Sequence, residues 1–240
     1  MYFFKNIDIS KLFVIKIMNG EDGKRWLKSI MIAVFIFLLF SLYLFVRRGY
    51  YNLYIINKVL GSSAVILAGA TLIIGPLRKI SFITPFMTIR RHLGLVAFLF
   101  SILHITASLV QTERFELFGW YIEEWVPVTF GIIAILIWSY MAYISRNVKI
   151  QEMGPDLWKK YLSLAGKVGF VAIFLHVTVM KYEGWIRWFN GEIKQSPQLA
   201  NPTYPPASLF VFIFMLAVIL YRVYKILTET KKQKSVDEKI

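Results

Sequence analysis

The chain has 240 residues, no cysteine and a formal net charge of +14 at pH 7. With 57% hydrophobic residues and a mean hydropathy of +0.57, it is far more apolar than a soluble domain of this length, which indicates a polytopic membrane protein. The lack of cysteine excludes disulfides, thiolate metal sites, iron–sulfur clusters and covalently attached c-type haem. The basic residues lie between apolar runs, as topology signals do, which argues against a nucleic-acid partner.

Six apolar runs are each long enough to cross a bilayer, since a spanning helix needs about 20 residues. The sequence therefore predicts an all-α fold, a polytopic six-helix transmembrane bundle surrounded by membrane lipid. The predicted spans are residues 29–46, 54–75, 92–110, 127–144, 161–180 and 207–221.

Three parts follow from this pattern. Residues 1–28, with a turn cluster at 19–23, are expected to form a cytoplasmic or interfacial segment and a loop. Residues 29–225 form the transmembrane domain, whose first span carries no cleavage site and should remain attached. Residues 226–240 form a charged tail that we expect to be disordered.

The two longest connections are also predicted to lie at the membrane surface. Residues 112–125 are acidic and rich in aromatic residues, and residues 181–206 are rich in helix-breaking and aromatic residues. Lysine and arginine number 20 on the side that holds both termini and 7 on the other side. This asymmetry predicts that both termini are cytoplasmic.

His104 and His176 lie inside the third and fifth spans, in a chain with three histidines. Because both spans cross in the same direction, their positions put both side chains roughly 7 to 11 Å below the outer boundary. An intramembrane histidine is costly unless it has a partner in the protein interior. Two imidazoles at one depth suit the axial positions of a non-covalent haem b, which would then serve electron transfer. The alternative is interhelical hydrogen bonding, worth only about 0.6 kcal/mol on average.

The remaining polar residues near the inner boundary have ordinary explanations. His92 lies roughly 120° around the helix from His104, and we expect it at the surface rather than as a ligand of a second haem. Arg90 and Arg91 mark the inner face, and Lys167 can extend toward it. The alternative role for these three cations is to pair with haem propionates or a flavin phosphate.

Several short motifs occur in an order that resembles the ferric reductase-like transmembrane domain and, within it, the MsrQ type, a haem-binding membrane subunit that serves a periplasmic methionine-sulfoxide reductase. The resemblance covers about residues 55–182. The motifs are GPLRK at 75–79, RRHLGL at 90–95, the Leu103–His104 pair, Trp158, and His176 followed by Lys181.

This resemblance implies a b-type cytochrome in the plasma (inner) membrane, an oxidoreductase subunit with a quinone, FMN or other flavin as electron donor and a reductase subunit as acceptor outside. It implies His104 and His176 as the haem ligands. Leu162 stands where the family has a further histidine, which argues against a second haem even though His92 lies near an inner ligand position of the broader group. A flavin or nicotinamide domain would have to be a separate partner.

Two other functions remain open on the sequence. One is a ferric or other metal reductase that acts directly on a small acceptor at the outer face. The other is a haem-free membrane transporter or assembly protein, in which the histidines only pack between helices.

Overall fold

The computed structural model describes residues 20–111 and 123–237, and the side chains of these residues up to 228. The described chain forms α-helices joined by short connections, with one 3-10 helix, and contains no β-strand. Six of the helices are long and apolar enough to cross a membrane, which confirms the predicted all-α, six-span class. The elements are α2 (Glu21–Arg48), α3 (Leu53–Ile74), η2 (Thr84–Thr88), α4 (Arg90–Val110), α6 (Trp125–Ile144), α7 (Asn147–Met153), α8 (Pro155–Phe189) and α9 (Ala207–Asp237).

Local sequence sets several helix ends. The side chain of Asn52 accepts a hydrogen bond from the backbone N–H of Ile55 at 3.1 Å and so caps α3. Gly49 ends α2 with φ of 80°, a left-handed conformation that glycine adopts without steric cost. Pro155 opens α8 at a position where its missing N–H is not needed.

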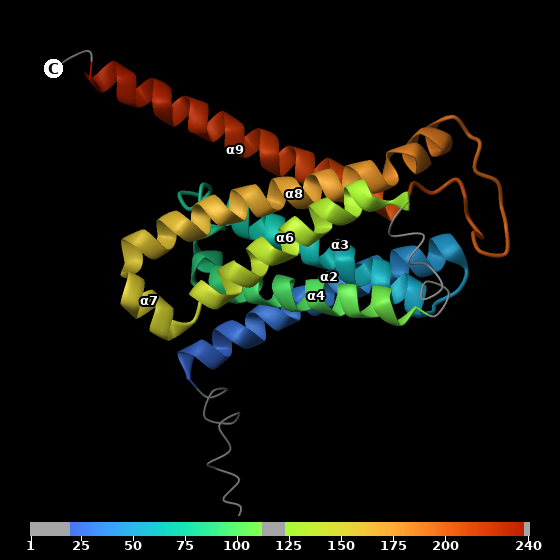
Figure 1. Cartoon of the computed structure of the whole chain (residues 1–240), viewed down its shortest axis with the longest axis horizontal. Coiled ribbons are helices and arrows are strands. Elements are labelled where there is room, and N and C mark those ends of the chain that lie inside the picture. The colour runs from blue at the N-terminus through green and yellow to red at the C-terminus, as the bar shows by residue number, and fades with distance from the viewer. Residues whose placement is uncertain (1–19, 112–122, 238–240) are drawn as a thin grey trace, which may run out of the picture.

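Helix α3 is the centre of the bundle. In its most apolar window 56% of the residues are buried, compared with 22% for α4 and 17% for α6. It packs against α2, α4, α8 and α9, as Figure 1 shows. In the other spans most residues of the apolar window are at least partly exposed, so α3 is the most buried of the six spans.

Two antiparallel helix pairs form the closest packing in the bundle. Helix α4 packs along α3, and α8 packs along α6 (Figure 1). In each pair the helix that carries a predicted ligand, His104 or His176, follows its packing partner in the chain. The pairs thus repeat one arrangement at two places in the bundle.

The second, third and fourth spans begin and end within two residues of their predicted boundaries. The first, fifth and sixth spans are longer than predicted. The expected turn at 19–23 and loop to residue 28 are wrong from Glu21 onward, because α2 already begins there. Its first turn carries Glu21 and Asp22, which suit a helix N-terminus, and Lys24 pairs with Glu21 at 2.8 Å.

Helices α8 and α9 also continue beyond the predicted spans. Helix α8 extends to Phe189, and Trp185 on this extension is buried and donates from Nε1 to the hydroxyl of Ser208 at 3.0 Å. Helix α9 runs on to Asp237, so the predicted disorder after residue 225 is wrong up to that point. Charged residues alone did not end these helices, since lysine and glutamate are good helix formers.

The connection 190–206 is irregular, as predicted, and is held by α2. The backbone N–H of Asn201 donates to the carbonyl of Arg47 at 3.0 Å, and Arg47 returns a bond from Nε to the carbonyl of Tyr204 at 2.9 Å. Tyr43 donates to the carbonyl of Pro205 at 2.5 Å. Predictions for residues 1–19 and 112–122 lie outside the described residues.

Gly69 provides a test of this packing. A Cβ at this position would overlap the ring of Phe214 on α9 and approach that of Phe170 on α8 to 3.1 Å. We expect Gly69→Ala to lower the midpoint of thermal unfolding in detergent, because overpacking costs about 1–3 kcal/mol and the gain in helix propensity is at most about 1 kcal/mol. Gly94→Ala is the control, since its nearest neighbour would be Thr71 at 3.9 Å. Equal midpoints for the two variants would contradict this packing.

Candidate functional site

His104 is anchored to the helix that precedes it. Its Nδ1 lies 2.9 Å from the backbone carbonyl oxygen of Asn57 on α3. The ring lies against Gly61, where an added Cβ would be 3.1 Å from both Nδ1 and Cε1. Asn57 also donates from its side-chain amide to Ser108 of α4 at 2.8 Å, so α3 and α4 are tied at this level.

His176 has the same arrangement on the other helix pair. Its Nδ1 lies 2.7 Å from the backbone carbonyl oxygen of Pro127 on α6. The ring lies against Gly131, where a Cβ would be 3.0 Å from Nδ1. In both cases the glycine follows the carbonyl residue by one helical turn.

These hydrogen bonds fix the protonation of both rings. A carbonyl oxygen can only accept, so Nδ1 carries the proton in each neutral imidazole and Nε2 carries the lone pair. A metal-binding histidine shows this pattern, in which one ring nitrogen donates to a backbone carbonyl while the other binds the metal. In each neutral ring Nε2 is therefore the nitrogen that carries the lone pair a metal would require.

The two histidines lie toward the same end of the bundle. Helix α4 ends where α3 and α6 begin, and α8 passes in the same direction as α4 (Figure 1). Each ring contacts one of the first three turns of its partner helix, α3 for His104 and α6 for His176. The equal membrane depth expected from the sequence stays a prediction.

The two histidine helices do not form an extensive interface with each other, because α4 packs mainly on α3 and α8 mainly on α6. Helices in full contact lie about 8–10 Å apart, which leaves no room for a flat macrocycle between their imidazoles. Within the described residues no cluster of three or more potential metal ligands occurs. A haem iron with two histidine ligands requires only two protein ligands, because the porphyrin would supply the other four.

His92 is not at the surface, contrary to the sequence-based expectation. It is 3% exposed, and its Nε2 lies 3.0 Å from Oδ1 of Asp22 on α2. Trp26 packs edge-on against its ring with a centroid separation of 5.0 Å. The early start of α2 explains the difference, since the turn that covers His92 was predicted to be a loop.

Arg90 and Arg91 bind the ends of neighbouring helices. Arg90 donates from Nε to the carbonyl of Thr71 near the end of α3 at 2.6 Å, and Arg91 donates to the carbonyl of Ser145 at the end of α6. Cationic side chains are favourable at helix C-termini, where carbonyls have no intrahelical partner. Lys167 is partly buried on α8, N-terminal to His176. The structure thus gives the two arginines a structural role at the opposite end from His104.

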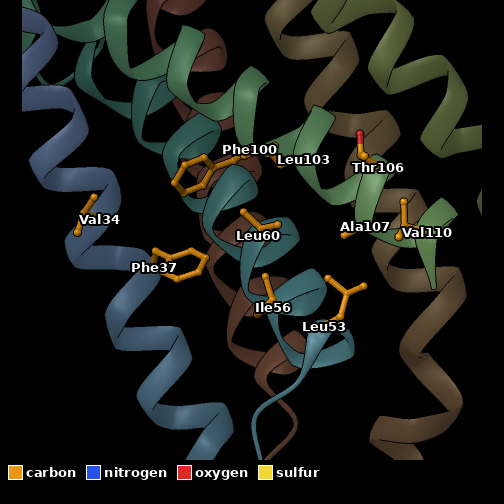
Figure 2. A pocket seen from close by; sticks show the side chains of 10 residues that line it. All are labelled: Val34, Phe37, Leu53, Ile56, Leu60, Phe100, Leu103, Thr106, Ala107 and Val110. Carbon is orange, nitrogen blue, oxygen red and sulfur yellow. The ribbon is translucent and has the colours of Figure 1, made fainter. Parts of the chain in front are cut away.

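An open apolar groove of about 600 Å³ lies between α2, α3 and α4, and neither His104 nor His176 is among its lining residues (Figure 2). Leu103 and Leu60, which line it, precede His104 and Gly61 in the sequence. Thr106 carries the single side-chain oxygen among the lining residues in Figure 2. Such a lining accommodates a hydrocarbon chain and offers no partner to a charged group.

A comparison with known protein families found a similarity in the middle of the chain. Residues 59–162 match the ferric reductase like transmembrane component. This match confirms the resemblance to the broad ferric reductase-like family, without distinguishing the MsrQ type within it, and it suggests a membrane redox or electron-transfer role. The ferric reductase-like stretch runs from α3 into the start of α8 and covers less than half of the chain. It includes His92 and His104 and ends before His176.

Sequence reasoning missed the groups that hold the two rings. Neither Gly61 nor Gly131 was predicted to contact a histidine, and no role was given to the carbonyls of Asn57 and Pro127. The sequence does contain a signal for these contacts. The spanning helix that packs against each histidine helix carries a glycine, Gly61 for His104 and Gly131 for His176. Backbone carbonyls carry no residue-type signature, so their part needed coordinates.

The arginine assignment can be tested with Arg90→Gln. We expect this variant to lose about 1.5–3 kcal/mol of stability, the range for hydrogen bonds to charged groups, because the Thr71 carbonyl loses its cationic donor. Thermal unfolding in detergent measures the effect, with exposed Arg78→Gln as the control. Unchanged stability together with loss of a bound chromophore would instead assign Arg90 to a cofactor.

Proposed function

We propose that the protein is a six-span b-type cytochrome that passes electrons across the membrane. In this proposal it lies in the plasma (inner) membrane with both termini in the cytoplasm. It takes electrons from a quinol or flavin donor and delivers them to a reductase subunit on the outer side. The match to the ferric reductase like transmembrane component supports the redox part of this proposal.

The observation that carries the proposal is the pair of equivalent imidazoles. His104 and His176 stand on different helices near one end of the bundle, each with Nδ1 hydrogen-bonded to a helix carbonyl at 2.9 and 2.7 Å. A histidine that only linked two helices would not need the same protonation state and the same glycine contact at both places. This repetition favours two ligands of one group over two unrelated packing residues.

Haem b would be held by Nε2 of both histidines and would supply a one-electron iron couple. The chain itself contributes rigidity, since the two carbonyls prevent either ring from rotating. It also contributes an apolar environment, which helps to set a redox potential. With His104 and His176 both holding the iron, no protein-free position would remain for oxygen, and electron transfer would be the expected use.

The outer-side acceptor follows from the position of the two histidines. Both lie toward the end where α3 and α6 begin, which is the outer end if the termini are cytoplasmic. A donor on the cytoplasmic side would then be separated from the acceptor by the membrane. Direct reduction of a ferric chelate and a haem-free transport role are the competing functions.

The ligand pair predicts the behaviour of three histidine variants. His104→Ala and His176→Ala should each abolish haem binding in purified protein, because one axial ligand is lost. His92→Ala is the matched control and should retain haem, since its ring is directed at Asp22 and Trp26 of α2. Haem content per chain and the reduced-minus-oxidised spectrum measure this. Haem retained at the wild-type level in His104→Ala or His176→Ala would overturn the assignment.

A cavity rescue separates loss of a ligand from misfolding. We expect His104→Gly to regain a low-spin spectrum when imidazole is added, because the free base can occupy the space left by the side chain. The same treatment of His92→Gly should change nothing. Failure of rescue in a variant that unfolds at the wild-type temperature would count against His104 as an iron ligand.

The acceptor can be tested with reduced, purified protein mixed with a ferric chelate and no partner. If a protein subunit is the acceptor, re-oxidation followed by absorbance should be slow. Rapid re-oxidation that saturates with chelate concentration would instead favour a direct ferric reductase. A wild-type spectrum that lacks haem bands would favour the haem-free alternative.

A further inference from the structure

We propose that Gly61 and Gly131 are positioning residues that set the orientation of the two imidazoles. Each glycine leaves room for one ring to reach the helix carbonyl one turn earlier, Asn57 for His104 and Pro127 for His176. The inference rests on the proposed function, because it assigns these contacts to the iron ligands.

Helix geometry explains why the carbonyl and the glycine occur together. In an α-helix the carbonyl of residue i points toward the N–H of residue i+4, and side chains tilt toward the N-terminus. A side chain at i+4 therefore stands beside that carbonyl and blocks a group that approaches from a neighbouring helix. Without a Cβ, a ring can lie against the backbone and share the carbonyl, which has two lone pairs.

The contact with an imidazole is specific to these two positions. Among the described glycines from α3 to α8, only Gly61 and Gly131 would place a Cβ against a histidine ring. The other glycines within these helices meet hydrocarbon side chains, as Gly166 does with Leu72 at 3.4 Å, or an aromatic side chain, as Gly169 does with Trp138 at 2.9 Å, and Gly184 meets nothing within 4 Å. General helix packing accounts for those contacts and would not select histidine twice.

A methyl group at either glycine has a limited and defined effect. At 3.0–3.1 Å the ring must move by a few tenths of an ångström, which lengthens or tilts the bond from Nδ1 to the carbonyl. A weaker hydrogen bond from Nδ1 makes the imidazole a less basic ligand. The less basic ligand would stabilise ferric iron less, and this loss is larger for ferric than for ferrous iron. The midpoint potential should therefore rise. Alanine is also the better helix former, so the variant should fold.

The test compares Gly61→Ala and Gly131→Ala with two controls on the histidine helices. Gly94→Ala on α4 and Gly166→Ala on α8 add the same methyl group where the nearest atoms lie at 3.9 and 3.4 Å. Gly69→Ala adds a clash with Phe214 that touches no histidine. The readouts are the low-spin EPR g-values, the midpoint potential, haem retention, and the ring ¹⁵N resonances of the haem-free protein.

We expect Gly61→Ala and Gly131→Ala to shift the g-values, raise the midpoint potential and retain haem about 10-fold less tightly. A 10-fold change is at the low end of the effect of losing a ligand's hydrogen-bond partner. The Nδ1 resonance of His104 should move in Gly61→Ala, and that of His176 in Gly131→Ala, toward a weaker hydrogen bond. The three controls should leave these readouts unchanged, although Gly69→Ala lowers stability.

The two proposals fail in different ways. If wild-type protein binds haem but Gly61→Ala and Gly131→Ala behave like Gly94→Ala in every readout, the positioning role is overturned and the cytochrome assignment stands. If wild-type protein binds no haem but the Nδ1 resonances still move as expected, the glycines position the rings and the proposed function is wrong. Unchanged resonances in a haem-free wild type would overturn both.

Discussion

The hydrogen bond from an imidazole Nδ1 to a helix carbonyl is the interaction on which the structure of the site depends. It occurs twice, from His104 to Asn57 and from His176 to Pro127. Each bond fixes the protonation state, limits rotation of the ring and leaves Nε2 as the nitrogen that can bind a metal. Each bond also depends on packing between consecutive spans, since the acceptor lies on the preceding membrane helix. The antiparallel pairs α3–α4 and α6–α8 are thus the units that build the site, and α3 joins them at the centre of the bundle.

The opposite end of the bundle holds the helices together by charge. Arg90 and Arg91 supply donors to the carbonyls near the ends of α3 and α6, and buried His92 contacts Asp22 of α2. These contacts satisfy polar groups that would be costly to leave unpaired in an apolar environment. One end therefore stabilises the arrangement of helices, and the other end presents the two imidazoles.

Hydrophobic length predicted the class of fold and both boundaries of the second, third and fourth spans to within two residues, because a membrane imposes one requirement on every crossing segment. It did not predict that α2 begins at Glu21, where charged residues continue the helix, and this hid the burial of His92. The position of each histidine within its span and the common direction of the two spans predicted His104 and His176 as a pair. The sequence could not supply the acceptor carbonyls, since every residue has one and only the rotation of neighbouring helices decides which carbonyl meets a ring.

The central claim is that both imidazoles bind one iron through Nε2. Electron–nuclear double resonance on purified protein, with ¹⁵N placed selectively at Nδ1 or Nε2 of histidine, tests it directly because the chain has three histidines. The account predicts that Nε2 labelling changes the strong coupling of two equivalent axial nitrogens, and that Nδ1 labelling does not. A coupling to a single histidine nitrogen, or one that follows the Nδ1 label, would contradict it.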